Sequence, residues 1–246
     1  MSVPDASNPI VFFKAMCRAF AVSLVSSRDR RDPIESLSRQ AFESFAEGVA
    51  LEANKDAPVA CRGGCASCCA IRVVATAPEV LSLARQIRAF PQKLSSGLKQ
   101  RILAADRATR LLDQQQRMDS SVGCPLIEDD YCGVYAVRPL ACRGHASFDE
   151  DACRDALKGG AYEVPISALH LTVRSLVQNA MQSALRDAGL AWGSYELNQA
   201  LAIALSDETC ERAWMTGDDV FASALITDVS LAEMAETFDA LKAMAA

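Results

Sequence analysis

The chemistry of this sequence is concentrated in its cysteines. Seven of the ten lie in two short segments, the first holding Cys61, Cys65, Cys68 and Cys69 and the second holding Cys124, Cys132 and Cys142. Thiolates gathered this closely repel one another unless a cation or a cluster neutralises them. We therefore predict that the two segments fold together around an inorganic centre, with all seven cysteines as candidate ligands.

The spacing inside the first segment supports the same interpretation. Cys61-x3-Cys65 and Cys65-x2-Cys68 allow one loop to direct two or three sulfurs toward one centre. Glycines beside the cysteines permit the positive φ angles that curl a backbone around a metal, and arginine charges would offset those of several thiolates. These accompanying residues are candidates for contacts to the bound group: Arg62, Gly63, Gly64, Arg138 and Arg143.

Seven sulfurs exceed the needs of one site, because zinc and a cubane iron–sulfur cluster each take four cysteines. One cluster with spare cysteines, two sites, or a polynuclear site with bridging thiolates would each use them. A donor set without dedicated histidines favours an iron–sulfur cluster of the 4Fe–4S type over a mixed zinc site. Zn²⁺ stays the alternative.

The ordered motifs of residues 58–155 resemble the YkgJ-type CxxCxxCC cysteine-cluster family. The residues that carry the resemblance are Cys61…Cys65…Cys68-Cys69, Cys124-Pro125-Leu126, Cys132-Gly133-Val134-Tyr135 and Arg138-Pro139…Cys142-Arg143. The sequence departs from the family at Cys61-x3-Cys65, where the family name implies two intervening residues. The resemblance implies a zinc- or iron-chelating domain, often labelled an iron–sulfur protein. It therefore indicates a site rather than a reaction.

Three functional hypotheses are open at this point. The first is a metal-binding protein that acts in electron transfer or metal handling, or whose metal is a structural staple. The second is an enzyme, because the flagellin lysine-N-methylases look like members of the same group and use S-adenosylmethionine; Cys61, Cys65 and Cys68 also have the spacing of the radical-SAM motif. Against it, the sequence lacks the strand–helix alternation of a βα barrel. The third is an interaction module whose fold is fixed by zinc.

Other polar residues give weaker signals. Cys153 and His145 could join the ligands, whereas His170 has the position of a core histidine in a long helix. Cys17 and Cys210 lie in helical stretches and are expected to pack as small hydrophobes. Because the whole chain has two histidines, we do not expect a hydrolase built on a histidine base.

The composition is that of a soluble globular protein, with 50% hydrophobic and 23% charged residues. A net charge of −6 without a basic stripe argues against nucleic acid and against an anionic membrane surface. No targeting segment is recognisable, so we expect a cytoplasmic location, where ten cysteines indicate metal rather than disulfides. The apolar helices at both ends could supply a face for a homodimer or a protein partner.

Helical periodicity predicts an all-α fold, an irregular helical bundle with two cysteine-rich loops converging on the metal site. We expect a single domain over residues 1–246, with N-terminal helices at 10–56, a cysteine-cluster core at 57–160 and a C-terminal helical part at 161–246. Capping signals at Asp32, Thr76 and Ser230 mark the start of three helices. Further helices are expected over 10–25, 98–118 and 194–206, and from Ser147 and Pro165 onward.

Overall fold

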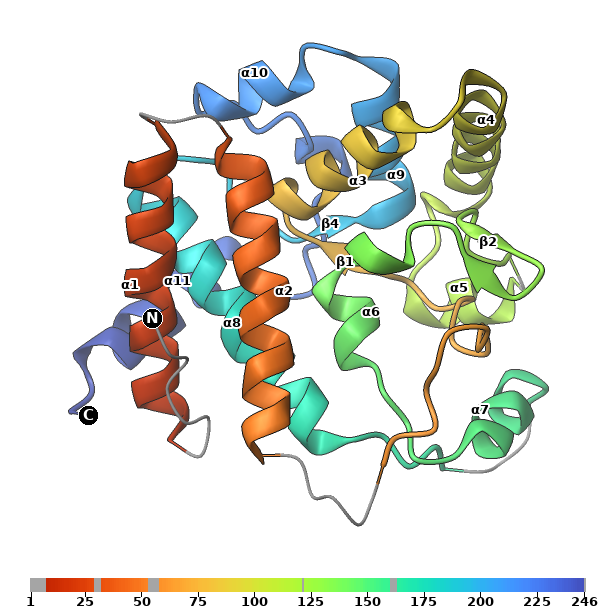
Figure 1. The fold of residues 1–246 in the computed structure, drawn as a ribbon, viewed down its shortest axis with the longest axis horizontal. Helices are drawn as coiled ribbons and strands as arrows, with labels where there is room; N and C mark the ends of the chain where they lie inside the picture. The colour runs from red at the N-terminus through yellow and green to blue at the C-terminus, as the bar shows by residue number, and fades with distance from the viewer. Residues whose placement is uncertain (1–7, 29–31, 53–57, 121, 160–162, 246) are drawn as a thin grey trace.

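Helices dominate the structure, a computed structural model that describes residues 8–28, 32–52, 58–120, 122–159 and 163–245 (Figure 1). Within these ranges the helices are α1 (Pro9–Arg28), α2 (Pro33–Glu52), α3 (Ala77–Ala89), α4 (Gln92–Thr109), α5 (Gln114–Asp119), α6 (Leu140–Gly144), α7 (Glu150–Leu157), α8 (Ala168–Asp187), α9 (Leu197–Ser206), α10 (Cys210–Met215) and α11 (Leu231–Ala243), with the 3-10 turns η1 (Tyr135–Val137) and η2 (Ala222–Ala224). The strands are β1 (Val74–Ala75), β2 (Ile127–Glu128), β3 (Tyr131–Cys132) and β4 (Tyr195–Glu196). The predicted all-α class is confirmed.

Helices α1, α2 and α8 carry much of the hydrophobic core. α1 and α2 lie side by side, and both pack on α8 (Figure 1). The core includes Phe12, Phe13 and Phe20 of α1 together with Val173 and Val177 of α8, all of them fully buried. Apolar residues three or four positions apart share one face of a helix, so each of these helices presents an apolar stripe to its neighbours.

A second group of helices is formed by α3, α4 and α9. α3 packs on α2 and on α9, and α4 packs on α9. The antiparallel pair of β1 and β4, with Val74 opposite Glu196, connects the end of the first cysteine loop to this group. The cysteine-bearing segments lie on the side of the molecule away from α1 (Figure 1).

The three predicted capping signals are confirmed. The Asp32 side chain accepts hydrogen bonds from two backbone N–H groups of the first turn of α2, at 3.1 and 3.2 Å. Thr76 with Glu79, and Ser230 with Glu233, form capping boxes at the starts of α3 and α11. Each cap satisfies backbone N–H groups that have no partner within the helix.

The helix predicted over residues 98–118 was wrong in extent, because two helices cover this region. α4 begins at Gln92 and ends at Thr109, and α5 begins after Asp113. The Asp113 side chain accepts a hydrogen bond from the Gln116 N–H at 2.8 Å, and the Gln116 side chain accepts one from the Asp113 N–H at 3.0 Å. This capping box restarts the helix, a local signal that apolar periodicity does not register.

Several helices begin later than predicted, at the residue that caps them. α7 starts after Asp149 and α8 after Ser167, and residues 195–196 form β4 before α9 begins. The five-residue helix α6 was not predicted, because it is too short to show a period. The predicted boundaries at 56–57 and 160–161 involve residues outside the described ranges. None of the helices within those ranges combines the length and hydrophobicity needed to cross a bilayer.

Candidate metal centre

The loop between α2 and β1 holds four of the cysteines in a backbone that turns twice. Cys65 and Cys69 each donate their backbone N–H to the carbonyl three residues earlier, at 3.2 and 2.9 Å. Gly64 has a φ of +86°, the left-handed region that glycine tolerates best. A Cβ on Gly64 would lie 3.1 Å from the Tyr131 ring, so the missing side chain also lets this tyrosine cover the loop. The positive φ expected of the glycines is therefore found at Gly64.

A tight hairpin presents Cys132. β2 and β3 pair with Ile127 opposite Cys132, and the two turn residues, Asp129 and Asp130, have φ values of +48° and +64°. Positive φ at both central residues matches the twist of a two-residue hairpin. The Cys124 N–H, just before this hairpin, donates to the Cys69 carbonyl at 2.7 Å. This hydrogen bond joins the two cysteine-rich segments directly.

A buried carboxyl group, that of Glu79, anchors the helix that carries Cys142. The Glu79 Oε1 atom accepts the N–H of Leu140, the first residue of α6, at 2.7 Å. Its Oε2 atom accepts hydrogen bonds from the N–H and the hydroxyl of Thr76, at 2.8 and 2.7 Å. Burial raises the pKa of Glu79, and these hydrogen bonds act in the opposite direction. One side chain in α3 thereby fixes the N-terminus of α6.

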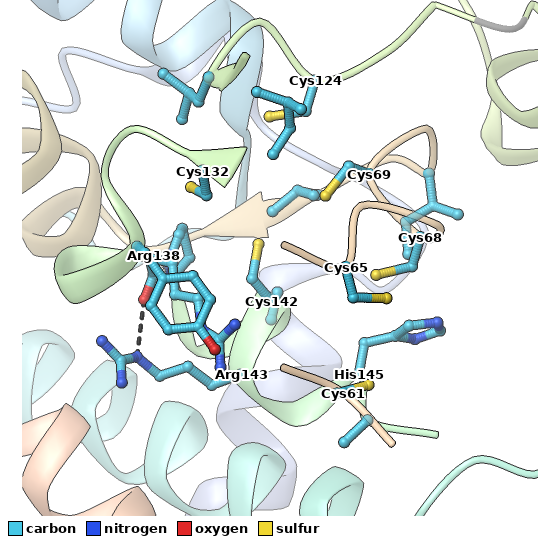
Figure 2. A pocket seen from close by; sticks show the side chains of 18 of the residues that line it. Cys61, Cys65, Cys68, Cys69, Cys124, Cys132, Arg138, Cys142, Arg143 and His145 are labelled. Atoms are coloured by element: carbon cyan, nitrogen blue, oxygen red, sulfur yellow. Dashed lines mark hydrogen bonds between the residues drawn. The ribbon is translucent and has the colours of Figure 1, made fainter. Parts of the chain in front are cut away.

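All seven predicted cysteine ligands line one cavity of about 250 Å³. This volume is well above the roughly 10–15 Å³ that a single water needs. Figure 2 shows the cysteines entering the cavity from the first loop, from the segment with Cys124 and the β2–β3 hairpin, and from α6. The prediction that the two cysteine-rich segments converge is therefore confirmed, since Cys65 and Cys68 share this cavity with Cys124, Cys132 and Cys142.

The sulfurs of the cavity influence one another electrostatically. Burial raises the pKa of Cys142, and the neighbouring thiolates of Cys124 and Cys68 raise it further. Burial also raises the pKa of Cys124 to about 11, with a further contribution from Cys132. The hydrogen bond from the Cys69 thiol lowers the pKa of Cys68 to about 7, against the effect of burial, and raises that of Cys69. Several negative thiolates are thus disfavoured here without a cation.

The predicted arginines differ in how they face this centre. Arg138 lies over the Tyr135 ring at 4.0 Å. Burial raises the pKa of Cys132, and the Arg138 charge acts in the opposite direction; on Cys68 it adds to the lowering by the Cys69 hydrogen bond. Arg143 lines the cavity, but its guanidinium donates to backbone carbonyls at 2.9 and 2.6 Å and stacks over Phe42.

Arg62 is 63% exposed at its side chain and forms an ion pair with Glu150. Gly63 is exposed and does not belong to the cavity wall. Arg138 is consequently the predicted arginine that acts most directly on the sulfurs.

Three further sulfurs lie outside the cavity wall. Cys153, on α7, is half-buried; burial raises the pKa of Cys61, and the charge of Cys153 adds a small part to this shift. Cys17 packs against the hydrophobic core, and Cys210 is buried with its thiol 3.9 Å from the Ile203 carbonyl oxygen. The expectation that Cys17 and Cys210 pack as small hydrophobes agrees with these positions.

Among the residues of the cavity wall that sequence reasoning missed, two come from α8. His145 lines the cavity, but so do His170 and Arg174, both from α8. His170, predicted as a core histidine, is half-buried, with its Nδ1 atom 2.8 Å from the Ser167 hydroxyl oxygen. The available signal was the four-residue spacing of His170 and Arg174, which places both on one face of the helix.

The sulfurs surround the cavity and do not meet at one point. Among the described residues, no three side chains of histidine, cysteine, aspartate or glutamate are arranged to hold one metal ion. The donor set nevertheless suits a soft metal or an iron–sulfur cluster, because thiolate sulfur is the preferred ligand of both. The residues present therefore fit the chemistry of such a group, with the sulfurs spread over the wall of a shared space.

Comparison with known proteins assigns this segment to a class. Residues 60–158 match the family model CxxCxxCC, described as a "putative zinc- or iron-chelating domain". The match supports the resemblance of this segment to the cysteine-cluster family, and it supports a metal as its cofactor. No curated protein and no solved structure matches the chain.

Proposed function

We propose that the protein binds an iron–sulfur cluster, with zinc as the alternative, through the cysteines that line the cavity, and that it works in electron transfer or metal handling. One observation carries the proposal: seven cysteines from separate segments of the chain line a single cavity. A cytoplasmic or otherwise reducing location fits this use, because cysteines must stay reduced to bind a metal. A homodimer or protein partner at the terminal helices stays a prediction.

The thermodynamic argument rests on the buried sulfurs. The pKa of Cys124 lies at about 11 and that of Cys142 is also raised, so both thiols keep their protons at neutral pH when no cation is near. A bound metal displaces these protons and supplies the positive charge that the cavity lacks. Metal binding thereby stabilises the arrangement of loops that brings the sulfurs together.

The arrangement of the sulfurs favours a cluster over a single zinc ion. Zinc requires four ligands at about 2.0–2.3 Å from one point, whereas a cubane distributes its cysteine ligands over four separate iron atoms. The sulfurs border a cavity of about 250 Å³, which has room for a group several atoms wide. A group that is itself several atoms wide suits this geometry better than one ion.

Metal content and colour test the proposal on protein purified without oxygen. We expect a brown solution with broad visible absorption and with iron and acid-labile sulfide in stoichiometric amounts. A colourless protein with stoichiometric zinc would select zinc, including the hypothesis of a zinc-stapled interaction module. A protein that contains neither metal and takes up neither on reconstitution would overturn the proposal.

Single cysteine variants test which sulfurs matter. Cys65→Ala and Cys68→Ala should lose metal and stability together, because both side chains line the cavity. Cys17→Ala and Cys210→Ala are matched controls, since these cysteines pack elsewhere. Equal metal content in all four variants would contradict the assignment of the site.

A second candidate function is an S-adenosylmethionine-dependent protein methylase. The observation in its favour is that Cys61, Cys65 and Cys68 border one cavity with room for a small molecule. The described fold argues against a standard barrel enzyme of this type, because its strands form two two-stranded antiparallel pairs. Cleavage of S-adenosylmethionine by the reduced protein would support this function. An intact cluster without such cleavage would exclude it.

A further inference from the structure

One part of the cavity wall carries nitrogen donors instead of sulfur. It consists of His145, which follows α6, and of His170 and Arg174 from α8. These are the two histidines of the chain, and both border the same cavity as the cysteines. Figure 2 shows the His145 ring on the side of the cavity where Cys61 and Cys65 lie.

Close packing between α6 and α8 fixes the position of Arg174. A Cβ placed on Gly144 would lie 2.5 Å from the Cβ and Cδ atoms of Arg174, so the arginine stem lies flat across this glycine. His170 is one turn earlier on α8 and therefore on the same face as Arg174. His145 lines the same cavity; burial lowers its pKa, and the Arg174 charge acts in the same direction. Helix packing thus brings the three side chains together.

These donors have hydrogen-bonding capacity that the described protein residues do not use. The buried Arg174 Nε atom has no partner, and the hydrogen bond from Nη2 to the Ser175 hydroxyl is long, at 3.5 Å. His170 uses Nδ1 for Ser167, which leaves its Nε2 atom available. Among the described residues, no hydrogen bond involves the His145 ring. Arg174 is half-buried, and a donor shielded from water without a partner is costly, so this wall is suited to a ligand that accepts hydrogen bonds.

The acidic side chains near this wall do not neutralise Arg174. Asp130 is the one carboxylate among the described lining residues, and it is exposed in the β2–β3 turn. Glu79 acts on Arg174 through its charge, but its two oxygens already accept three hydrogen bonds from Thr76 and Leu140. Arg174 forms no ion pair within the described part of the chain.

We propose that Arg174, His145 and His170 form a binding site for an anionic group, a carboxylate or a phosphate, on a small ligand that enters the cavity beside the cysteines. The planar guanidinium offers paired N–H donors that match two oxygens of such a group, and the histidine rings add donors from the side. The site places the rest of the ligand next to the sulfurs. The proposal goes beyond metal binding and does not depend on which metal the cysteines hold.

The test uses metal-bound protein as purified, titrated with inorganic phosphate and separately with acetate at constant ionic strength. Histidine-selective NMR follows the two ring signals, which are few enough to assign by comparing His145→Gln with His170→Gln. We expect saturable shifts of both rings, and the anion that saturates at the lower concentration identifies phosphate or carboxylate as the preferred group. Chloride at the same ionic strength should produce no saturation.

Variants separate a binding site from a general charge effect. Arg174→Gln should weaken binding about tenfold or more, as expected for the loss of charge-assisted hydrogen bonds. Arg107→Gln is the matched control, because Arg107 is exposed on α4 and does not border the cavity; it should bind as the wild type does. Arg174→Lys keeps the charge and the stem, so it serves if Arg174→Gln does not fold, and it should bind more weakly than wild type because the paired donors are lost.

Two results would overturn the proposal, and neither depends on a variant that folds poorly. One is the absence of saturable shifts in wild-type protein with both anions. The other is equal affinity in Arg107→Gln and in whichever Arg174 variant retains the helical circular dichroism of the wild type. Either result would mean that Arg174 offsets the charge of the thiolates and does not bind an anion. Loss of metal binding with intact anion binding would instead count against the proposed function.

Discussion

Removal of the Glu79 side chain should lower the free energy of unfolding by more than the loss of an ordinary helix cap does. In Glu79→Ala, two buried backbone N–H donors, those of Thr76 and Leu140, lose their acceptor. An unsatisfied buried donor costs about 1–3 kcal/mol, so we expect a loss of roughly 4 kcal/mol in the free energy of unfolding. The second donor begins α6, so the position of Cys142 should loosen as well.

A matched capping box provides the control for this variant. Ser230 and Glu233 make the same pair of hydrogen bonds at α11, at 2.9 and 2.7 Å, but Glu233 is exposed. Water can replace its carboxylate, so Glu233→Ala should cost about 1 kcal/mol or less. Urea unfolding followed by circular dichroism measures both values, and metal analysis of the same samples measures the effect on the site. Similar losses of stability in the two variants would refute the reasoning.

Three further predictions concern charge, reactivity and packing. Burial raises the pKa of Glu79 above its ordinary value of 4.5. The free energy that Glu79 contributes to folding is therefore complete below pH 4.5 and declines as the pH rises through the folded-state pKa. Glu79→Gln should lack this decline when the free energy of unfolding is measured from pH 4 to 7. After metal removal, iodoacetamide at pH 7 should alkylate Cys68 far faster than Cys124, because the pKa of Cys68 is about 7 and that of Cys124 about 11. Mass spectrometry measures both rates, and equal rates would contradict the environments assigned to the two thiols. Gly144→Ala should destabilise by about 1–3 kcal/mol because its Cβ has no room, whereas Gly97→Ala, with nothing within 4 Å, should be neutral or stabilise α4 by up to about 1 kcal/mol, as thermal unfolding would show.

Features encoded by a few neighbouring residues could be predicted from the sequence. The caps at Asp32, Thr76 and Ser230 are local, and each appears where it was expected. Convergence of the two cysteine-rich segments was also predictable, because so many thiols have one common chemical use. The break between α4 and α5 was equally local, but the prediction followed apolar period and overlooked Asp113.

The parts of the site that depend on distant packing could not be predicted in this way. Arg62 and Arg143 flank cysteines in sequence, yet one pairs with Glu150 and the other stacks on Phe42. Arg174 lies more than thirty positions after Cys142 and reaches the cavity only because Gly144 lets α6 approach α8 closely. Sequence proximity therefore predicted which sulfurs and which arginines border the cavity, but not the partners that these arginines have.

The distribution of burial separates the helical scaffold from the cysteine loop. No residue from 58 to 73 is fully buried, whereas α3, α8 and α9 each contribute many fully buried side chains. The loop is held by few contacts of its own, among them the Ala60 N–H to the Ser147 carbonyl at 2.8 Å and the Cys124 N–H to the Cys69 carbonyl at 2.7 Å. Hydrophobic burial therefore stabilises the helices, whereas the proposed metal would stabilise the loop through its sulfurs. A bound metal would in this way act on the cysteine loop more than on α8, which carries His170 and Arg174.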